Sequence, residues 1–115
     1  MNCNKLLIVL ERLGIRRVDA EVYIHLEARG PKKGRELSKE LRMNKQPLYR
    51  SLKRLRKKGL VKASLKRPAS FTAVTIEDVL DSFGEAKLEE ARVIKEKKDE
   101  LLARWQSLLK NDSET

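Results

Sequence analysis

The basic side chains of this sequence are concentrated in a stretch that lacks acidic residues. From Leu41 to Ile76 the chain carries eleven Lys and Arg and no Asp or Glu. Solvated surfaces usually intersperse both signs of charge, so such a run indicates either a polyanionic partner or a disordered basic tail. Leucines recur through the stretch at spacings that bury an apolar face, which a disordered tail lacks. We therefore expect a folded segment that faces nucleic acid.

The polar residues after Arg42 have the chemistry that recognises DNA. Asn44 is a good helix N-cap, and Pro47 would fall in the first turn of the following helix, where the N–H that proline lacks has no intrahelical acceptor. We expect this helix to run to Lys58 and to end at Gly59. Its leucines would face the core. The side chains expected to point outward, with the N-cap, are the predicted DNA contacts of this helix: Asn44, Lys45, Gln46, Tyr49, Arg50, Lys53, Arg54 and Lys57.

These side chains divide into base-reading and phosphate-binding groups. Arg50 can donate a bidentate pair to guanine, and Gln46 can pair with adenine. Tyr49 either contacts a phosphate or covers the edge of the core. The side chains expected to neutralise flanking phosphates are Lys53, Arg54 and Lys57.

Three earlier helices would position this one. Amphipathic patterns predict one helix that ends at Gly14, a second from near Asp19 to Gly30-Pro31, and a third that opens at Gly34. A tight turn at Arg42 joins the third helix to the fourth, which is the arrangement of a helix-turn-helix. Such turns often carry Gly, so either the turn differs here or Arg42 adopts a left-handed conformation at a cost of about 1–2 kcal/mol.

After Gly59 the pattern changes to that of a β-hairpin. Residues 60–65 and 70–74 read as its two strands, and the tip is the basic segment Lys66-Arg67-Pro68-Ala69. A hairpin directly after a recognition helix forms a wing. Lys66 and Arg67 are therefore further predicted DNA contacts, and Arg67 could enter the adjacent minor groove, where a narrow A·T-rich tract concentrates negative potential.

The C-terminal part of the chain differs in charge. Residues 1–75 hold 20 basic and 6 acidic side chains, net +14, whereas residues 76–115 hold 7 and 11, net −4. We predict a DNA-binding domain over residues 1–75 and a C-terminal helix over residues 76–115. Capping patterns at Thr75 and Ser82 allow one long helix or two with a joint near Gly84, and we favour the joint.

The second half of this helix has the spacing of a coiled-coil seam. Such a helix needs a partner, and a second copy of the chain is the most economical one; a two-fold dimer would place two recognition helices roughly 34 Å apart, on successive major grooves. Lys87 and Lys98 fall in the seam and weaken it, unless their stems cover the apolar stripe or an antiparallel register pairs them with glutamates. The predicted dimer interface is Ala91, Ile94, Leu101, Leu102, Trp105 and Leu108.

Several short motifs of the first 80 residues resemble the winged-helix domain of TrmB-type archaeal transcriptional regulators, and more distantly MarR- and ArsR-like winged helices. The resemblance implies a mainly α (α+β) winged helix-turn-helix with a two-stranded wing, which binds operator DNA as a dimer. Arg16 stands where such domains often have a Ser or Thr cap. Family members with a sugar-sensing domain are much longer, so a sugar response is not implied. The motifs are Leu13-Gly14-Ile15, Ala20-Glu21-Val22-Tyr23-Ile24, Gly30-Pro31, Glu36-Leu37-Ser38, Leu48-Tyr49-Arg50-Ser51-Leu52, Lys58-Gly59-Leu60-Val61 and Arg67-Pro68.

The sequence contains little that indicates an enzyme. One cysteine, Cys3, and one histidine, His25, are too few for a zinc cluster or a Cys-His dyad, and the chain lacks phosphate-loop and hydrolase motifs. We therefore expect no enzyme activity, no cofactor and no metal, and no polar constellation indicates a small-molecule effector. No apolar run approaches the roughly 20 residues that span a bilayer, so we expect a cytoplasmic, nucleoid-associated protein without membrane contact.

Three functions remain open from the sequence. The first is a homodimeric transcriptional regulator that binds double-stranded DNA at specific sites. The second is an architectural or chromatin-like protein that coats DNA through phosphate contacts with little discrimination. The third is an interaction module in which the C-terminal helix recruits another protein.

Overall fold

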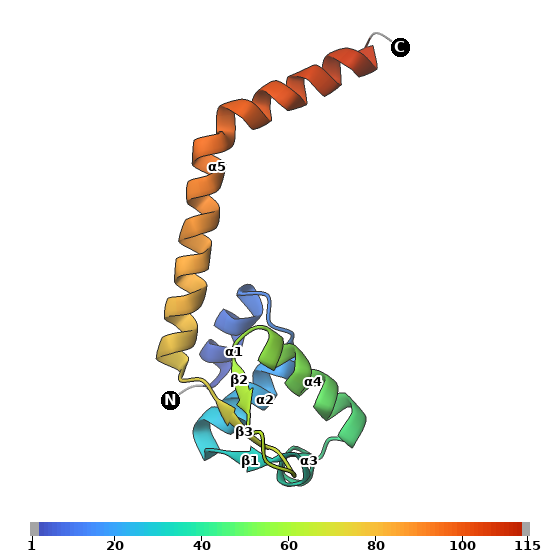
Figure 1. Cartoon of the computed structure of the whole chain (residues 1–115), viewed down its shortest axis with the longest axis vertical. Coiled ribbons are helices and arrows are strands. Elements are labelled where there is room, and N and C mark those ends of the chain that lie inside the picture. The colour runs from blue at the N-terminus through green and yellow to red at the C-terminus, as the bar shows by residue number, and fades with distance from the viewer. Residues whose placement is uncertain (1–2, 114–115) are drawn as a thin grey trace. The chain divides into compact units, whose positions relative to one another are not determined.

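The computed structural model describes residues 3–113, which form five helices and three short strands (Figure 1). The chain divides into two compact units, an N-terminal unit (Met1–Leu80) and a C-terminal unit (Asp81–Thr115). The elements in chain order are α1 (Cys3–Arg12), α2 (Arg17–Arg29), β1 (Lys32–Lys33), α3 (Gly34–Leu41), α4 (Lys45–Lys57), β2 (Val61–Ala63), β3 (Ser70–Ala73) and α5 (Ile76–Ser113).

The core of the N-terminal unit is aliphatic and is built by all four of its short helices. Leu10, Leu26, Leu37 and Leu52 are almost completely buried, one from each helix. Tyr23 of α2 is the largest buried side chain, and its hydroxyl donates a hydrogen bond of 2.6 Å to the carbonyl oxygen at the end of the wing. Burial raises the pKa of Tyr23, so the hydroxyl stays a donor. These contacts confirm the predicted helical framework.

The turn between α3 and α4 contains a left-handed residue, as one of the two predicted alternatives requires. Arg42 has φ 54° and ψ 43°, and its backbone N–H bonds back to the end of α3. Asn44 occupies the N-cap position of α4 in an extended conformation, but its side chain makes no capping hydrogen bond. Arg16 likewise precedes α2 without a side-chain cap. The predicted helix start at Asn44 is therefore confirmed in position but not in its capping bond.

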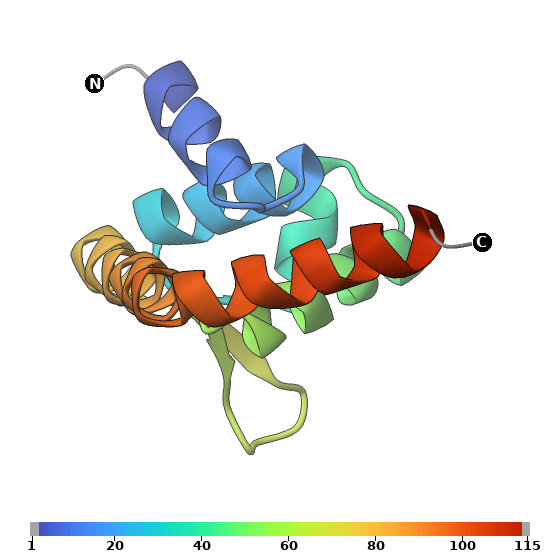
Figure 2. The ribbon, with the colours of Figure 1, turned by 90° about the horizontal axis from the view of Figure 1, so that it is seen from above.

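The wing is an antiparallel hairpin within a sheet of three strands. β2 pairs with β3 in the register Val61↔Ala73 and Ala63↔Phe71, which confirms the predicted hairpin. The two-stranded wing is thus confirmed. β1 pairs with the other edge of β3, so the strand order is β1-β3-β2 and the sheet has a third strand that the sequence did not predict. A strand of two residues carries no periodicity that a sequence pattern could reveal. Seen from above, the hairpin projects away from the helices of its unit (Figure 2).

α5 is one continuous helix through Gly84, so the favoured joint is wrong. The first of the two capping patterns is used, because the Asp78 N–H donates to Thr75 Oγ1 at 3.3 Å, whereas Ser82 lies inside the helix. A single exposed glycine costs an α-helix only about 1 kcal/mol, which neighbouring turns can offset. Within residues 3–113, none of the helices combines the length and apolar character needed to cross a membrane.

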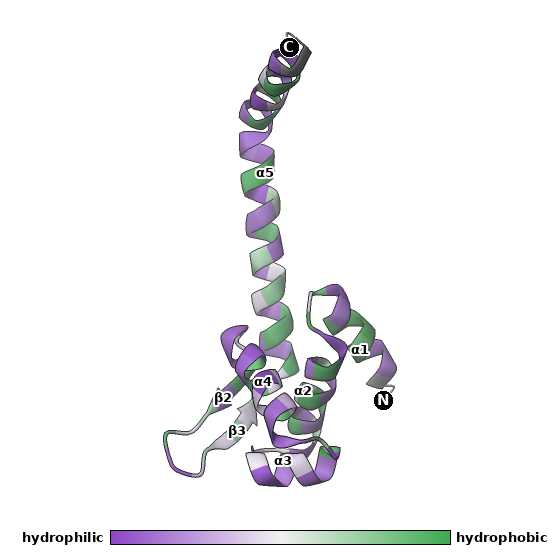
Figure 3. Cartoon of the chain, turned by 90° about the vertical axis from the view of Figure 1, so that its right-hand side faces the viewer, coloured by the Kyte–Doolittle hydropathy of each residue, from purple (hydrophilic) through white to green (hydrophobic). Residues whose placement is uncertain are grey.

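The C-terminal unit leaves its apolar side chains uncovered. Every side chain from Gly84 to Asn111 is exposed, including Ile94 at 62% and Trp105 at 58%. Green apolar positions recur along α5 in Figure 3. Leu88, at 73% exposure, extends the stripe and was not in the predicted set. Polar side chains pair with one another, for example Arg92 with Glu89 and Glu96.

Candidate nucleic-acid interface

Most side chains predicted to read DNA lie on one exposed face of α4. The two proposed base readers are adjacent, since Arg50 Nη2 donates to Gln46 Oε1 at 3.4 Å. They are one helical turn apart, near the N-terminal end of the helix that inserts in the major groove in helix-turn-helix proteins. The exposed members of the predicted set on this helix and its cap are Asn44, Lys45, Gln46, Tyr49, Arg50, Lys53 and Lys57.

Arg54 does not belong to this face, and the prediction that it points outward is corrected. Its guanidinium binds the carboxylate of Asp19 from α2 with two hydrogen bonds, Nε to Oδ2 and Nη2 to Oδ1, each 2.8 Å long. The Arg54 side chain is 29% exposed and that of Asp19 is 2% exposed. Arg54 therefore neutralises a buried carboxylate of its own domain.

Asp19 receives a third hydrogen bond, from Ser51 Oγ of α4 at 2.6 Å. Burial alone would raise the pKa of Asp19, but the hydrogen bonds from Arg54 and Ser51 and the charge of Arg54 outweigh it and lower the pKa. The carboxylate is thus ionised and fully engaged. The sequence pattern had marked Asp19 only as a helix start.

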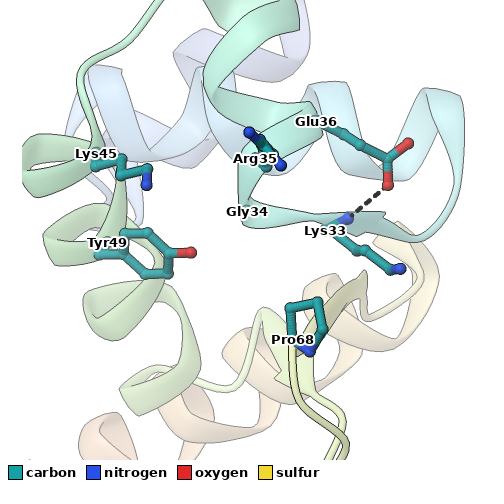
Figure 4. A pocket seen from close by; sticks show the side chains of 7 residues that line it. All are labelled: Lys33, Gly34, Arg35, Glu36, Lys45, Tyr49 and Pro68. Atoms are coloured by element: carbon teal, nitrogen blue, oxygen red, sulfur yellow. Dashed lines mark hydrogen bonds between the residues drawn. The ribbon is translucent and has the colours of Figure 1, made fainter.

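A cleft beside Tyr49 carries cations that the sequence did not single out. It is lined by α3, the start of α4 and Pro68 of the wing, and Lys33, Arg35 and Lys45 surround it (Figure 4). Glu36 is the one acidic group of the lining, and its Oε1 accepts the backbone N–H of Lys33 at 3.0 Å. The stretch without acidic residues begins only at Leu41, so it did not indicate Lys33 and Arg35 as DNA contacts.

Tyr49 covers the edge of the core. Its ring meets that of Phe71 in β3 edge-on, with 6.1 Å between centroids and 69° between planes. The hydroxyl lies against Gly34, where a larger residue would collide with it. Tyr49 is nevertheless 46% exposed. The core-edge alternative is confirmed, and contact with a phosphate remains a prediction.

The wing presents its basic tip to solvent. Lys66 and Arg67 are exposed. Two hydrogen bonds close the hairpin below the tip, from Ser64 N–H to Ser70 O and from Ser70 N–H to Ser64 Oγ, both 2.9 Å long. The hairpin is therefore closed below the tip, and both cations of the tip are accessible to a partner.

His25 belongs to a small charged cluster. Its Nε2 lies 2.7 Å from Glu40 Oε1, and Lys32 Nζ lies 3.3 Å from Glu40 Oε2. The hydrogen bond from His25 lowers the pKa of Glu40. The cluster ties α2, α3 and β1 together. Among the described residues, no group of three or more His, Cys, Asp or Glu could hold a metal ion.

Short helices, a tight turn into a basic helix and a projecting hairpin define the winged helix-turn-helix fold. Residues 10–77 match the family model described as sugar-specific transcriptional regulator TrmB. The chain belongs to the TrmB family, which confirms the resemblance seen in its motifs. A search of curated proteins found no match to the chain.

Solved structures share this fold. The chain is similar to TrmBL2, described as an archaeal chromatin protein with a novel mode of DNA binding, at a TM-score of 0.82 and 22% identity; the match covers 100% of this chain and 45% of that one. It thus spans less than half the length of TrmBL2. A possible transcriptional regulator from Methanosarcina mazei Go1 matches at a TM-score of 0.62 and 17% identity, over 76% of this chain and 80% of its own. A transcriptional regulator from Thermotoga maritima matches at 0.55 and 22%, over 92% and 81%.

Proposed function

We propose that this protein is a transcriptional regulator that binds specific sites in double-stranded DNA as a homodimer. The observation that carries the proposal is the pairing of Gln46 with Arg50 on the exposed face of α4. Arg50 can donate two hydrogen bonds to the edge of a guanine, and Gln46 can donate one to an adenine edge and accept one from it. They lie among cations that can bind the flanking phosphates. Those cations come from α4, the cleft and the wing: Lys33, Arg35, Lys45, Lys53, Lys57, Lys66 and Arg67. The protein would act at the nucleoid, in the cytoplasm.

The apolar stripe of α5 supports the homodimer. A helix of 38 residues is about 57 Å long at 1.5 Å per residue. Single helices with such a stripe are only marginally stable in water, and pairing with a second copy would bury the stripe on both. The proposed interface is Ala91, Ile94, Leu101, Leu102, Trp105 and Leu108, extended by Leu88.

The alternative function is a DNA-coating, chromatin-like protein. The specific observation in its favour is that the cations able to bind phosphate outnumber the two side chains placed to read bases. Such a protein would bind all duplexes with similar affinity and with a steep dependence on salt.

Equilibrium binding to selected DNA separates the two functions. Duplexes would be selected from a random pool with the full chain, and affinities compared with a scrambled duplex at about 0.15 M salt, where a regulator should prefer its site by roughly a thousandfold or more. Arg50→Ala should reduce that preference. Arg12→Ala, which removes the same charge from α1, should not. Equal affinity for both duplexes would favour the coating function.

The homodimer is tested separately by sedimentation equilibrium. Leu101→Asp places a charge in the stripe and should convert dimers to monomers. Val93→Asp makes the same kind of change outside the predicted seam and should leave the dimer intact. A wild-type chain that sediments as a monomer would overturn the homodimer and favour recruitment of another protein by α5.

A further inference from the structure

The contact between Asp19 and α4 is built differently from an ordinary surface ion pair. The carboxylate is almost fully buried, and its three hydrogen bonds, of 2.6, 2.8 and 2.8 Å, all come from α4. Ser51 and Arg54 are three residues apart, so they lie on the same side of the helix, one turn from each other. Asp19 therefore binds α4 at two positions, one helical turn apart.

The hydrogen bonds from Ser51 and Arg54 to Asp19 oppose rotation of α4 about its own axis. The outward residues Arg50 and Lys53 immediately precede Ser51 and Arg54 in the sequence. Turning the helix to move Arg50 would pull Ser51 and Arg54 away from a buried carboxylate. Breaking such a pair is strongly destabilising, because it leaves a charge buried without a partner.

Base reading and phosphate binding depend on this rotation to different degrees. A binding constellation must be held within about 0.5 Å and 10–20° of its productive geometry, and paired hydrogen bonds to a base edge depend on such alignment. A lysine ammonium is a point charge on a flexible stem, so it can follow a phosphate when the helix turns. If α4 is held less rigidly, the protein should therefore lose its preference for one DNA sequence before it loses overall affinity for DNA.

We propose that Asp19, Ser51 and Arg54 are positioning residues for sequence recognition, and that Arg54 binds no phosphate. They hold α4 in the rotation that presents Gln46 and Arg50 to base edges. This inference rests on the proposed sequence-specific binding. It assigns a role to a cation that the charge pattern alone places among the DNA contacts.

Two neighbouring residues give a matched test. Arg54→Met and Lys53→Met each remove one positive charge from α4, one at the inner face and one at the outer face. Binding of both full-length variants would be measured on the selected duplex and on its scrambled counterpart, from 50 to 200 mM salt. We expect Arg54→Met to lower the preference for the selected duplex roughly tenfold or more, comparable to losing one bidentate base contact, and to leave the salt slope unchanged. Lys53→Met should reduce the slope by about 0.9 for each copy that contacts DNA and leave the preference unchanged.

Further variants keep the test decisive if Arg54→Met folds poorly. Arg54→Lys retains the charge but cannot form the bidentate pair with Asp19. Ser51→Ala removes only the hydrogen bond from the Ser51 hydroxyl to Asp19. Both should reduce the preference without changing the slope. Folded fractions would be measured by circular dichroism at the binding temperature.

Each outcome bears on the proposal. A salt slope that falls equally in Arg54→Met and Lys53→Met would show that Arg54 binds a phosphate and would overturn it. Unchanged preference in every variant of Ser51 and Arg54 would reduce the contact to a purely structural one. If the wild-type chain itself shows no preference, the proposed sequence-specific function fails, and the positioning role fails with it. The slope comparison would still report separately on whether Arg54 touches DNA.

Discussion

Replacing Gly34 by alanine should destabilise the N-terminal unit while Tyr49 is present and stabilise it once Tyr49 is removed. A Cβ at Gly34 would lie 2.8 Å from Cζ of Tyr49, 3.3 Å from Cε1, and closer still to the hydroxyl oxygen. Three atoms of one rigid ring are involved, so the hydroxyl cannot move alone. The whole ring must swing away, and its edge-on contact with Phe71 is lost.

The expected magnitude follows from two opposing contributions. Overpacking of this kind typically costs about 1–3 kcal/mol, and this range includes the displaced ring. The lost aromatic pair alone accounts for about 0.5–1.5 kcal/mol of it. Gly34 has no positive φ, so alanine can adopt its backbone conformation and gains about 0.4–1 kcal/mol over glycine by lowering the entropy of the unfolded chain. The net effect of Gly34→Ala should be a loss of about 1 kcal/mol in the free energy of unfolding, and in a Tyr49→Ala background only this gain should remain.

A double-mutant cycle measures this reversal. Urea unfolding of the wild type, Gly34→Ala, Tyr49→Ala and the double variant should give a coupling energy of about 1–3 kcal/mol. Thermal unfolding offers a second readout, at about 4–8 °C per kcal/mol for a domain of this size. Effects that add to within about 0.5 kcal/mol would refute the argument, since they would show that the ring does not occupy the space above Gly34.

Three further predictions concern the framework around the interface. Tyr23→Phe should lower the free energy of unfolding in urea by about 1–2 kcal/mol, because it removes the hydroxyl that donates a hydrogen bond to the carbonyl oxygen of Val74; an unchanged midpoint would mean that this bond contributes nothing. The pKa of Asp19 is lower in the folded chain than its ordinary value of 3.8, so stability from this group is present above that pH and is lost as the pH falls below it. Acid titration of the unfolding free energy should therefore be less steep for Asp19→Asn than for the wild type, and identical slopes would contradict the assigned ion pair. Arg42→Gly should raise the thermal midpoint by relieving the left-handed residue, with a gain of up to about 1 kcal/mol. A lowered midpoint would show that the Arg42 side chain stabilises the turn.

The elements that follow from local rules could be predicted from the sequence. Helical periodicity and the glycines at the ends of helices located α1 to α4, and the change to extended residues after Gly59 located the wing. β1 could not be found, since two residues at the edge of β3 are defined only by their partner strand. Gly84 led to the prediction of a joint that the structure does not have. A single glycine disfavours a helix only weakly, and the turns on both sides of Gly84 are helical.

The elements of the candidate interface could be predicted from the sequence. The side chains whose orientation depends on contacts with distant parts of the chain could not. The run of basic residues pointed to α4 and the wing, where most of the predicted contacts are exposed, but helical spacing left Arg54 at the border between the inner and outer faces. Its partner Asp19 lies 35 residues earlier in the chain, and no local pattern links the two. Lys33 and Arg35 join the interface only because β1 and α3 fold beside α4.

In the proposed function, charge and position therefore contribute differently to DNA binding. Many cations spread over α4, the cleft and the wing can supply affinity, and the loss of any one of them removes a small share of it. In the proposed binding mode Gln46 and Arg50 read bases, and their placement depends on a buried contact that itself carries no net charge. A change at Asp19 would leave every surface cation in place and still move binding toward indiscriminate coating of DNA. The balance between the two proposed functions thus depends more on the inner face of α4 than on the number of positive charges outside it.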